Sequence, residues 1–214
     1  MGTTLRDDDA VLPAYRAAFG ECAIPFTEAE LADRGGAHKL SLFTDFATRR
    51  YPADEAPKIA AAALEVFESQ LRRLLETGGA TPISGAEDAI RRLRAAGIKV
   101  VLTSGFDRGL IADIVAHCGW AELFDAIVCP DEVPTGRPAP YLIFHAMQKT
   151  LVHSVARVAA IGDTVLDLQA GANAGAGWVI GALSGAHDLA TLGRTPHIHL
   201  LPSIAELPLL FAKI

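Results

Sequence analysis

The stretch Gly162–Asp167 (GDTVLD) directly follows the short apolar run Val158–Ile161. This run has the length and side chains of a strand that is buried on both faces of a parallel sheet. Ligands of open α/β sheets bind beyond the carboxyl ends of the strands. Asp163 and Asp167 are four residues apart, which places their carboxylates on one face as a helix begins. Two converging carboxylates predict a site for a hard cation such as Mg²⁺.

A plainer interpretation makes Asp163 the cap of the following helix and Asp167 a solvated helix residue. The small-residue run AGANAGAG (residues 170–177) follows the stretch and lets chain and helix approach closely. The strand before the stretch and this run after it favour the metal loop.

Short apolar runs alternate with helical patterns from about Ile98 onward. Strands are predicted at Ile98–Leu102, Ala126–Cys129, Val158–Ile161, Trp178–Ala182 and His197–Leu200. Helices are predicted at Arg108–Cys118, Pro138–Thr150, Leu166–Ala174 and Ile204–Ala212. The alternation indicates right-handed βαβ units and a doubly wound parallel sheet, which is an α/β fold.

The first third of the chain shows no strand pattern from Leu12 to about Gly79. Thr27 is placed to cap a helix, with Glu30 three residues later completing a capping box. Further helices are predicted at His38–Arg49 and Asp54–Thr77, and Gly78-Gly79 is expected to stop the last one. The sequence therefore predicts an all-helical block within an α/β chain.

Two more motifs carry chemistry. Ser104 and Gly105 follow the run Val100–Leu102, so the Ser104 hydroxyl and nearby backbone N–H groups are placed to bind a phosphate oxygen. Thr103 is the alternative hydroxyl if the register shifts by one, and an ordinary helix cap is the plainer interpretation. Arg137, within TGRPAP, lies between a strand and a helix, where its guanidinium could hold phosphate and neutralise charge in a transition state.

Composition narrows the classes of partner. The 214-residue chain has a formal net charge of −6 and no basic run, which argues against nucleic acid. No apolar run reaches the roughly 18 residues that a membrane span needs, and the acidic first ten residues do not resemble a signal peptide. Three cysteines without a CxxC pair suggest buried thiols in a reducing compartment, so a cytoplasmic location is expected.

These motifs, in this order, resemble those of the haloacid dehalogenase superfamily. Gly136-Arg137-Pro138, SGFDR (residues 104–108) and LSGAH (residues 183–187) resemble its phosphonatase-like branch, which includes phosphonoacetaldehyde hydrolase. The resemblance implies a Rossmann-like core of residues 1–11 and 80–214 and an inserted helical cap domain of residues 12–79. It also implies Mg²⁺ held by Asp163 and Asp167.

The start of the chain departs from the branch, whose first strand ends in DxAGTT. Gly2 and Thr3 match the end of that pattern and are expected to bind phosphate, whereas Met1 stands where the branch has Ala. The nucleophilic Asp would then lie two residues before Met1, and the first core strand before it. We therefore expect the chain as given to lack that strand and to be a poor catalyst. Residues 7–9, all Asp, follow the loop and do not replace the nucleophile.

Lys39 lies in a GxxK pattern (residues 36–39) that the phosphonoacetaldehyde hydrolases use for a Schiff-base lysine. The pattern there is MGxxKxxH, and here Gly35 replaces its Met and Leu42 replaces its His. Lys39 is therefore interpreted as a Schiff-base lysine, a substrate-facing cation or a solvated helix residue. His38 beside it could face the same cleft, and His187 is expected to cap a helix or to be solvated.

The resemblance implies Mg²⁺-dependent hydrolysis of a small phosphate ester or phosphonate through an aspartyl-phosphate. Ser104, Arg137 and Lys39 would be catalytic. The phosphate-binding set would be Gly2, Thr3, Thr103, Ser104, Gly105, Arg137 and His38. The alternatives are phosphonoacetaldehyde hydrolase itself, with Lys39 as the Schiff base, and an inactive binding or regulatory module. The expected partner is a small molecule, bound by a monomer or homodimer.

Overall fold

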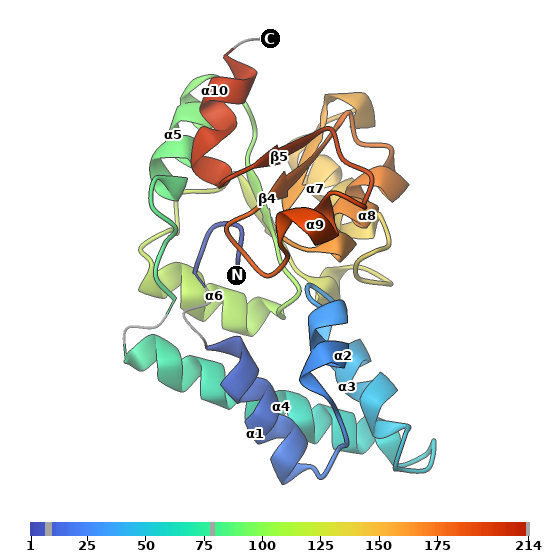
Figure 1. Ribbon diagram of the computed structural model, residues 1–214. Helices are drawn as coiled ribbons and strands as arrows, with labels where there is room; N and C mark the ends of the chain where they lie inside the picture. The colour runs from blue at the N-terminus through green and yellow to red at the C-terminus, as the bar shows by residue number, and fades with distance from the viewer. Residues whose placement is uncertain (7–9, 78–79, 213–214) are drawn as a thin grey trace.

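The computed structural model describes residues 1–6, 10–77 and 80–212. It divides into a block of helices (residues 10–77, here the helical block) and an α/β part, which lies above the block in Figure 1. The start of the chain lies between the two, below the strands (Figure 1). Residues 7–9 and Gly78-Gly79, the predicted helix stop, lie outside the described residues.

The helical block contains four helices among the described residues. They are α1 (Val11–Glu21), α2 (Glu28–Asp33), α3 (Lys39–Ala47) and α4 (Ala56–Glu76). The predicted capping box of α2 is present, because Thr27 Oγ1 accepts from Glu30 N at 3.3 Å and Thr27 N donates to the Glu30 carboxylate at 3.0 Å. The predicted all-helical character of this region is confirmed.

Aromatic side chains fill the interior of the helical block. Tyr15 and Phe19 of α1 pack with Phe43 of α3 and Phe67 of α4, and the Tyr15 and Phe67 ring centroids are 4.7 Å apart. Phe67 also lies 6.2 Å, between centroids, from Phe106 of the α/β part. Because buried aromatic rings remove much apolar area from water, this cluster stabilises the block and joins it to the α/β part.

In the part of the chain that the structure describes, five short strands form two parallel sheets. The strands are β1 (Val101–Thr103), β2 (Ala126–Val128), β3 (Ala159–Gly162), β4 (Trp178–Ala182) and β5 (His199–Leu201). β1 pairs with β2, and β3, β4 and β5 pair in that order; within the described residues no ladder joins β1 to β3. All the pairs are parallel, so the carboxyl ends of β1 and β2 meet at one edge, as do those of β3 and β4.

Helices cover the sheets. They are α5 (Ala86–Ala95), α6 (Arg108–His117), α7 (Tyr141–Thr150), α8 (Val165–Ala174), α9 (Leu189–Leu192) and α10 (Leu207–Phe211). Each predicted strand and helix is present. β4 has the predicted bounds and the others have shifted ends, while α1 and α5 were given no predicted range. The closing helix starts as a 3₁₀ turn, Ile204–Glu206, before α10. None of the described helices is long and apolar enough to cross a lipid bilayer.

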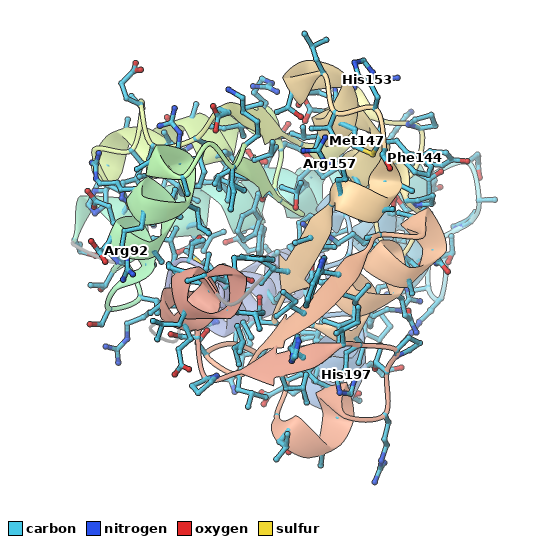
Figure 2. All side chains as sticks on the ribbon, turned by 90° about the horizontal axis from the view of Figure 1, so that it is seen from above. Arg92, Phe144, Met147, His153, Arg157 and His197 are labelled. Carbon is cyan, nitrogen blue, oxygen red and sulfur yellow. The ribbon has the colours of Figure 1, made fainter. Side chains whose placement is uncertain are left out.

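A mainly apolar hollow lies beside α7 in the α/β part. Phe144 and Met147 of α7 and His153 in the loop after it lie together in Figure 2. The hollow has a volume of about 430 Å³ and is also lined by Gln148, Leu151 and Val152.

Candidate functional site

The acidic loop Gly162–Asp167 begins at the last residue of β3 and enters the first turn of α8. Thr164, between the two aspartates, is the residue that caps α8. Its Oγ1 accepts from Asp167 N at 3.3 Å, and Asp167 Oδ2 accepts from Thr164 N at 3.0 Å. Asp163 therefore does not cap α8, and its carboxylate is left for another role.

The Asp163 carboxylate is buried, with only 4% of the residue exposed. Thr3 Oγ1 donates to its Oδ1 at 2.6 Å, and the backbone N–H of Ala186 donates to its Oδ2 at 3.0 Å. Burial and the neighbouring Asp167 carboxylate raise the pKa of Asp163 above its ordinary value, although these two donors oppose the shift. A bound cation would offset both the burial of the Asp163 charge and its repulsion from Asp167, so it would stabilise the charged form of Asp163.

Glycines shape the space around Asp163. A side chain at Gly2, where φ is +94°, or at Gly185 would overlap the Asp163 carboxylate.

Two carboxylates fit Mg²⁺, because Mg²⁺ keeps several waters and takes only one or two carboxylates with substrate oxygens. Among the described residues no group of three or more His, Cys, Asp or Glu forms a complete cage for a metal ion.

Arg137 joins the acidic loop to the end of β1. Its Nε lies 2.9 Å from Asp167 Oδ1, and its Nη2 donates to Thr103 Oγ1 at 2.8 Å. Only 10% of the Arg137 side chain is exposed, so this ion pair is weakly screened by solvent. Three motifs that lie far apart in the sequence thus meet at the carboxyl ends of β1 and β3.

Ser104 is buried one residue beyond β1. Its Oγ accepts from the backbone N–H of Phe106 at 2.9 Å, a bond that uses the oxygen and not the hydroxyl hydrogen. A side chain on the next residue, Gly105, would meet the carbonyl oxygens of Gly36 and Ala37 at 3.0 Å. The helical block therefore lies directly over this turn.

Lys39 is buried, with 6% of the residue exposed, at the first turn of α3. Its Nζ donates to Ala37 O at 3.1 Å and lies 5.2 Å and 5.7 Å from the ring centroids of Phe106 and Tyr15. The interpretation of Lys39 as a solvated residue is wrong, because packing between the block and Phe106 encloses the side chain. An ammonium over aromatic faces gains cation–π stabilisation.

His38, the residue before Lys39, also faces the α/β part. Its Nδ1 lies 3.0 Å from Ser41 Oγ, and its Nε2 lies 3.5 Å from Asp107 Oδ1. Asp107 directly precedes α6 and is three residues after Ser104, so His38 lies at the junction of block and core. The structure gives His38 a partner there but no direct bond to the acidic loop.

The loop Leu183–His187, which follows β4, contacts both the start of the chain and the acidic loop. Ser184 Oγ donates to Gly2 O at 2.8 Å, and Ala186 N donates to the Asp163 carboxylate. His187 bonds to the first turn of α8. The loop therefore holds both the start of the chain and the acidic loop in place.

The model of the haloacid dehalogenase-like hydrolase family matches residues 2–175, which is most of the chain. This chain belongs to that family. The phosphonoacetaldehyde hydrolase of Bacillus cytotoxicus is 38% identical over 127 residues, which cover 58% of this chain and 47% of the relative. The chain thus spans about half the length of the curated relatives it matches.

Two solved structures share the fold of this haloacid dehalogenase-like chain. The crystal structure of a hydrolase from Pseudomonas syringae gives a TM-score of 0.86 at 19% identity and covers 100% of this chain and 95% of that one. A phosphonoacetaldehyde hydrolase-like protein from Oleispira antarctica gives 0.79 at 17% identity, over 99% and 88%. The predicted HAD-like fold and the resemblance to the phosphonatase-like branch are confirmed.

Sequence analysis of this haloacid dehalogenase-like chain missed Ser184, Ala186 and His187 as parts of the site. The LSGAH motif marked their loop, but each of the three contacts has a backbone atom on one side, which leaves no trace in residue type. Thr3, in contrast, was predicted to bind phosphate, and the structure shows its hydroxyl on Asp163.

Proposed function

We propose that the chain carries the site of a Mg²⁺-dependent hydrolase of a small phosphate ester or phosphonate. The observation that carries this proposal is the chain of contacts Thr3–Asp163 and Asp167–Arg137–Thr103 at the carboxyl ends of the strands. It puts two carboxylates, which a bound Mg²⁺ would neutralise, and one guanidinium in a single buried site. With the cation in place, the site would suit a doubly charged phosphoryl group.

Asp163 and Asp167 would hold Mg²⁺, directly or through water. Bound there, Mg²⁺ would neutralise negative charge on the phosphoryl oxygens. Thr164 and Arg137 keep Asp167 fixed, and Thr3 and Ala186 fix Asp163, so both carboxylates are oriented before any ligand arrives. Such preorganisation lowers the cost of reorganisation during the reaction.

Ser104, Thr103 and Arg137 are proposed to bind the phosphoryl oxygens, together with backbone N–H groups near Gly2, Thr3 and Gly105. Arg137 faces both Thr103 and Asp167, so a phosphoryl group between them would contact a fixed cation. His38 and Lys39 are proposed to contact the remainder of the substrate from the helical block.

The proposed reaction has two displacements at phosphorus. A carboxylate oxygen attacks phosphorus, the bond to the leaving group breaks, and an aspartyl-phosphate forms; water then hydrolyses it and regenerates the carboxylate. The resemblance places this carboxylate two positions before Met1.

The helical block is proposed to act as the cap, with residues 12–79 as the cap domain and residues 1–11 and 80–214 as the core. The burial of Lys39 against Phe106 and the approach of Gly36 to Gly105 support this division. A block seated over the strand ends excludes water from the site and selects the substrate.

Phosphate release from a panel of small phosphate monoesters and phosphonoacetaldehyde tests the proposal. The 214-residue chain is compared with the same chain preceded by an apolar strand that ends in Asp-Xaa. We expect release by the extended form only, abolished by EDTA and by Asp163→Asn.

Release by neither form would contradict the proposal and favour an inactive binding module. Release by both forms would keep the hydrolase and remove the upstream nucleophile.

A second candidate is phosphonoacetaldehyde hydrolase with Lys39 as a Schiff base. The position of the Lys39 amine beside Phe106, two residues after Ser104, favours it, because a Schiff base needs an amine held at the site. Borohydride with the aldehyde should then attach a stable adduct to Lys39, detected by mass spectrometry of the peptide. The control is Lys39→Arg, which should form no adduct. If the wild-type Lys39 peptide also stays unmodified, this candidate is removed.

A further inference from the structure

Three hydrogen bonds converge on His187, at the end of the loop Leu183–His187. Its backbone N–H donates to the carbonyl of Asp163 at 3.2 Å. Its ring Nδ1 lies 3.0 Å from the backbone nitrogen of Val165, and its Nε2 lies 3.1 Å from the carbonyl oxygen of Ala32. Val165 begins α8 and Ala32 belongs to α2, so one imidazole joins the acidic loop to the helical block.

The two ring contacts require a single protonation state. The backbone N–H of Val165 can only donate, so Nδ1 accepts and carries no hydrogen. The carbonyl of Ala32 can only accept, so Nε2 carries the hydrogen and donates it. The neutral ring satisfies both partners, and Val165 is a first-turn donor that no helix carbonyl can reach.

The surroundings of His187 show how closely the block approaches the core. A Cβ at Gly35 would lie 3.6 Å from His187 Nε2 and 3.4 Å from Thr164 Cγ2. A Cβ at Gly36, where φ is +83°, would lie 2.7 Å from Thr164 Oγ1. Glycine therefore permits the approach, and the His187–Ala32 bond can form only when the block is seated.

We propose that His187 is a positioning residue that holds the helical block closed over the acidic loop. Its Nδ1 bond to Val165 fixes the ring on α8, and the fixed ring presents its Nε2–H to Ala32. Closure is thereby tied to the same turn that carries Asp163 and Asp167. The proposal deepens the proposed function, on which it rests for the meaning of closure, while the contacts themselves are independent of catalysis.

Two substitutions separate the two ring bonds. In His187→Asn, the amide oxygen takes the place of Nδ1 and can accept from Val165, but the side chain is too short to reach Ala32. In His187→Gln, the longer amide can donate to Ala32, but nothing accepts from Val165. His153→Asn is the matched control, because His153 is exposed in the loop after α7 (Figure 2).

Hydrogen–deuterium exchange of the metal-free chain measures both ends. The carbonyl of Ala32 that contacts His187 also accepts from Gly35 N, and the amides of Arg34 and Ala37 are bonded in the same turn. Exchange of these three amides therefore reports whether the His187 contact holds that turn. We expect His187→Asn to speed their exchange on the order of 3- to 10-fold, the opening expected when one net hydrogen bond is lost. We expect the first turn of α8 to stay protected in that variant and to exchange faster in His187→Gln.

Wild-type exchange over residues 34–37 in His187→Asn would overturn the proposal. A uniform rise over the whole chain in both variants would also overturn it, because His187 would then support the fold and not the closure. The readout uses no turnover, so a lack of phosphatase activity would count against the proposed function alone.

Discussion

At the residue scale, the buried carboxylate of Asp163 destabilises the metal-free fold. Its carboxylate is buried beside Asp167, and Thr3 and Ala186 are the two hydrogen-bond donors described on its oxygens. Burying a charge without a full complement of partners is unfavourable, which is why the pKa of Asp163 is raised. A residue that weakens the metal-free fold in this way is expected where a ligand later supplies the missing charge.

Asp163→Asn should therefore stabilise the metal-free chain at pH 7. Asn can accept from Ala186 N–H and donate to Thr3 Oγ1, so the geometry survives without the charge. The gain should be roughly 1 kcal/mol, the scale of one buried polar group. Because the folded pKa of Asp163 is raised, the wild-type penalty appears as pH rises, and the gap should close as pH falls toward the ordinary value of 3.8.

Urea unfolding in EDTA at pH 7 and pH 4 measures this gap. A less stable Asp163→Asn chain at pH 7 would show that the carboxylate is well compensated in the fold.

At the element scale, Glu132 ties the end of β2 to two helices. Its carboxylate accepts from Lys149 Nζ of α7 at 2.6 Å, from Cys129 N at 2.9 Å and from Arg108 of α6. Burial opposes the charged form, but the bonds from Lys149, Cys129 and Arg108 outweigh it and lower the pKa of Glu132 to about 2. This pairing holds α6 and α7 in place beside the site.

Glu132→Gln should destabilise the chain by about 1–2 kcal/mol at pH 7, because charge-assisted bonds are replaced by neutral ones. The contribution of Glu132 is fully present above its unfolded pKa, and it declines as pH falls toward about 2. The difference between the chains should therefore narrow between pH 7 and pH 3.5 in urea unfolding.

The control is Asp88→Asn, which should change little, because Asp88 is exposed and its partner Arg92 is 3.9 Å away. Arg92 points away from the molecule in Figure 2. An equal loss in both variants would argue against a special role for Glu132.

Local signals predicted elements well and contacts poorly. The capping box at Thr27 and the strand before Asp163 depend on residues that are close together in the sequence, and both are present. The start of α7 shifted from Pro138 to Tyr141, because Pro138 lies in the turn before the helix. The burial of Lys39 depends on Phe106, far along the chain, and no local pattern encodes such a contact.

At the scale of the whole molecule, the helical block and the α/β part meet along several contacts. Arg72 of α4 pairs with Asp113 of α6 at 2.9 Å, Phe67 packs near Phe106, and Gly36 lies against Thr164. The first of these pairs is exposed and weak, so apolar packing and the close glycine approach hold the two parts together.

Gly36→Ala should disturb this junction. The residue has φ of +83°, and its new methyl group would lie 2.7 Å from Thr164 Oγ1, so both backbone strain and contact oppose it. We expect a loss of about 1–2 kcal/mol in the free energy of unfolding. Gly20→Ala in α1, where the methyl group meets open space, should instead stabilise by up to about 1 kcal/mol.

Urea unfolding compares the two alanine variants. A Gly36→Ala chain as stable as Gly20→Ala would show that the block does not depend on a close approach at Thr164.

The central claim is that the loop Gly162–Asp167 is a Mg²⁺ site. Calorimetric titration of Mg²⁺ into the chain, into Asp163→Asn and into the control Asp88→Asn tests it most directly. We predict one binding event in the wild-type chain and in Asp88→Asn, and none in Asp163→Asn. Equal binding by all three chains, or no binding by the wild-type chain, would contradict the account.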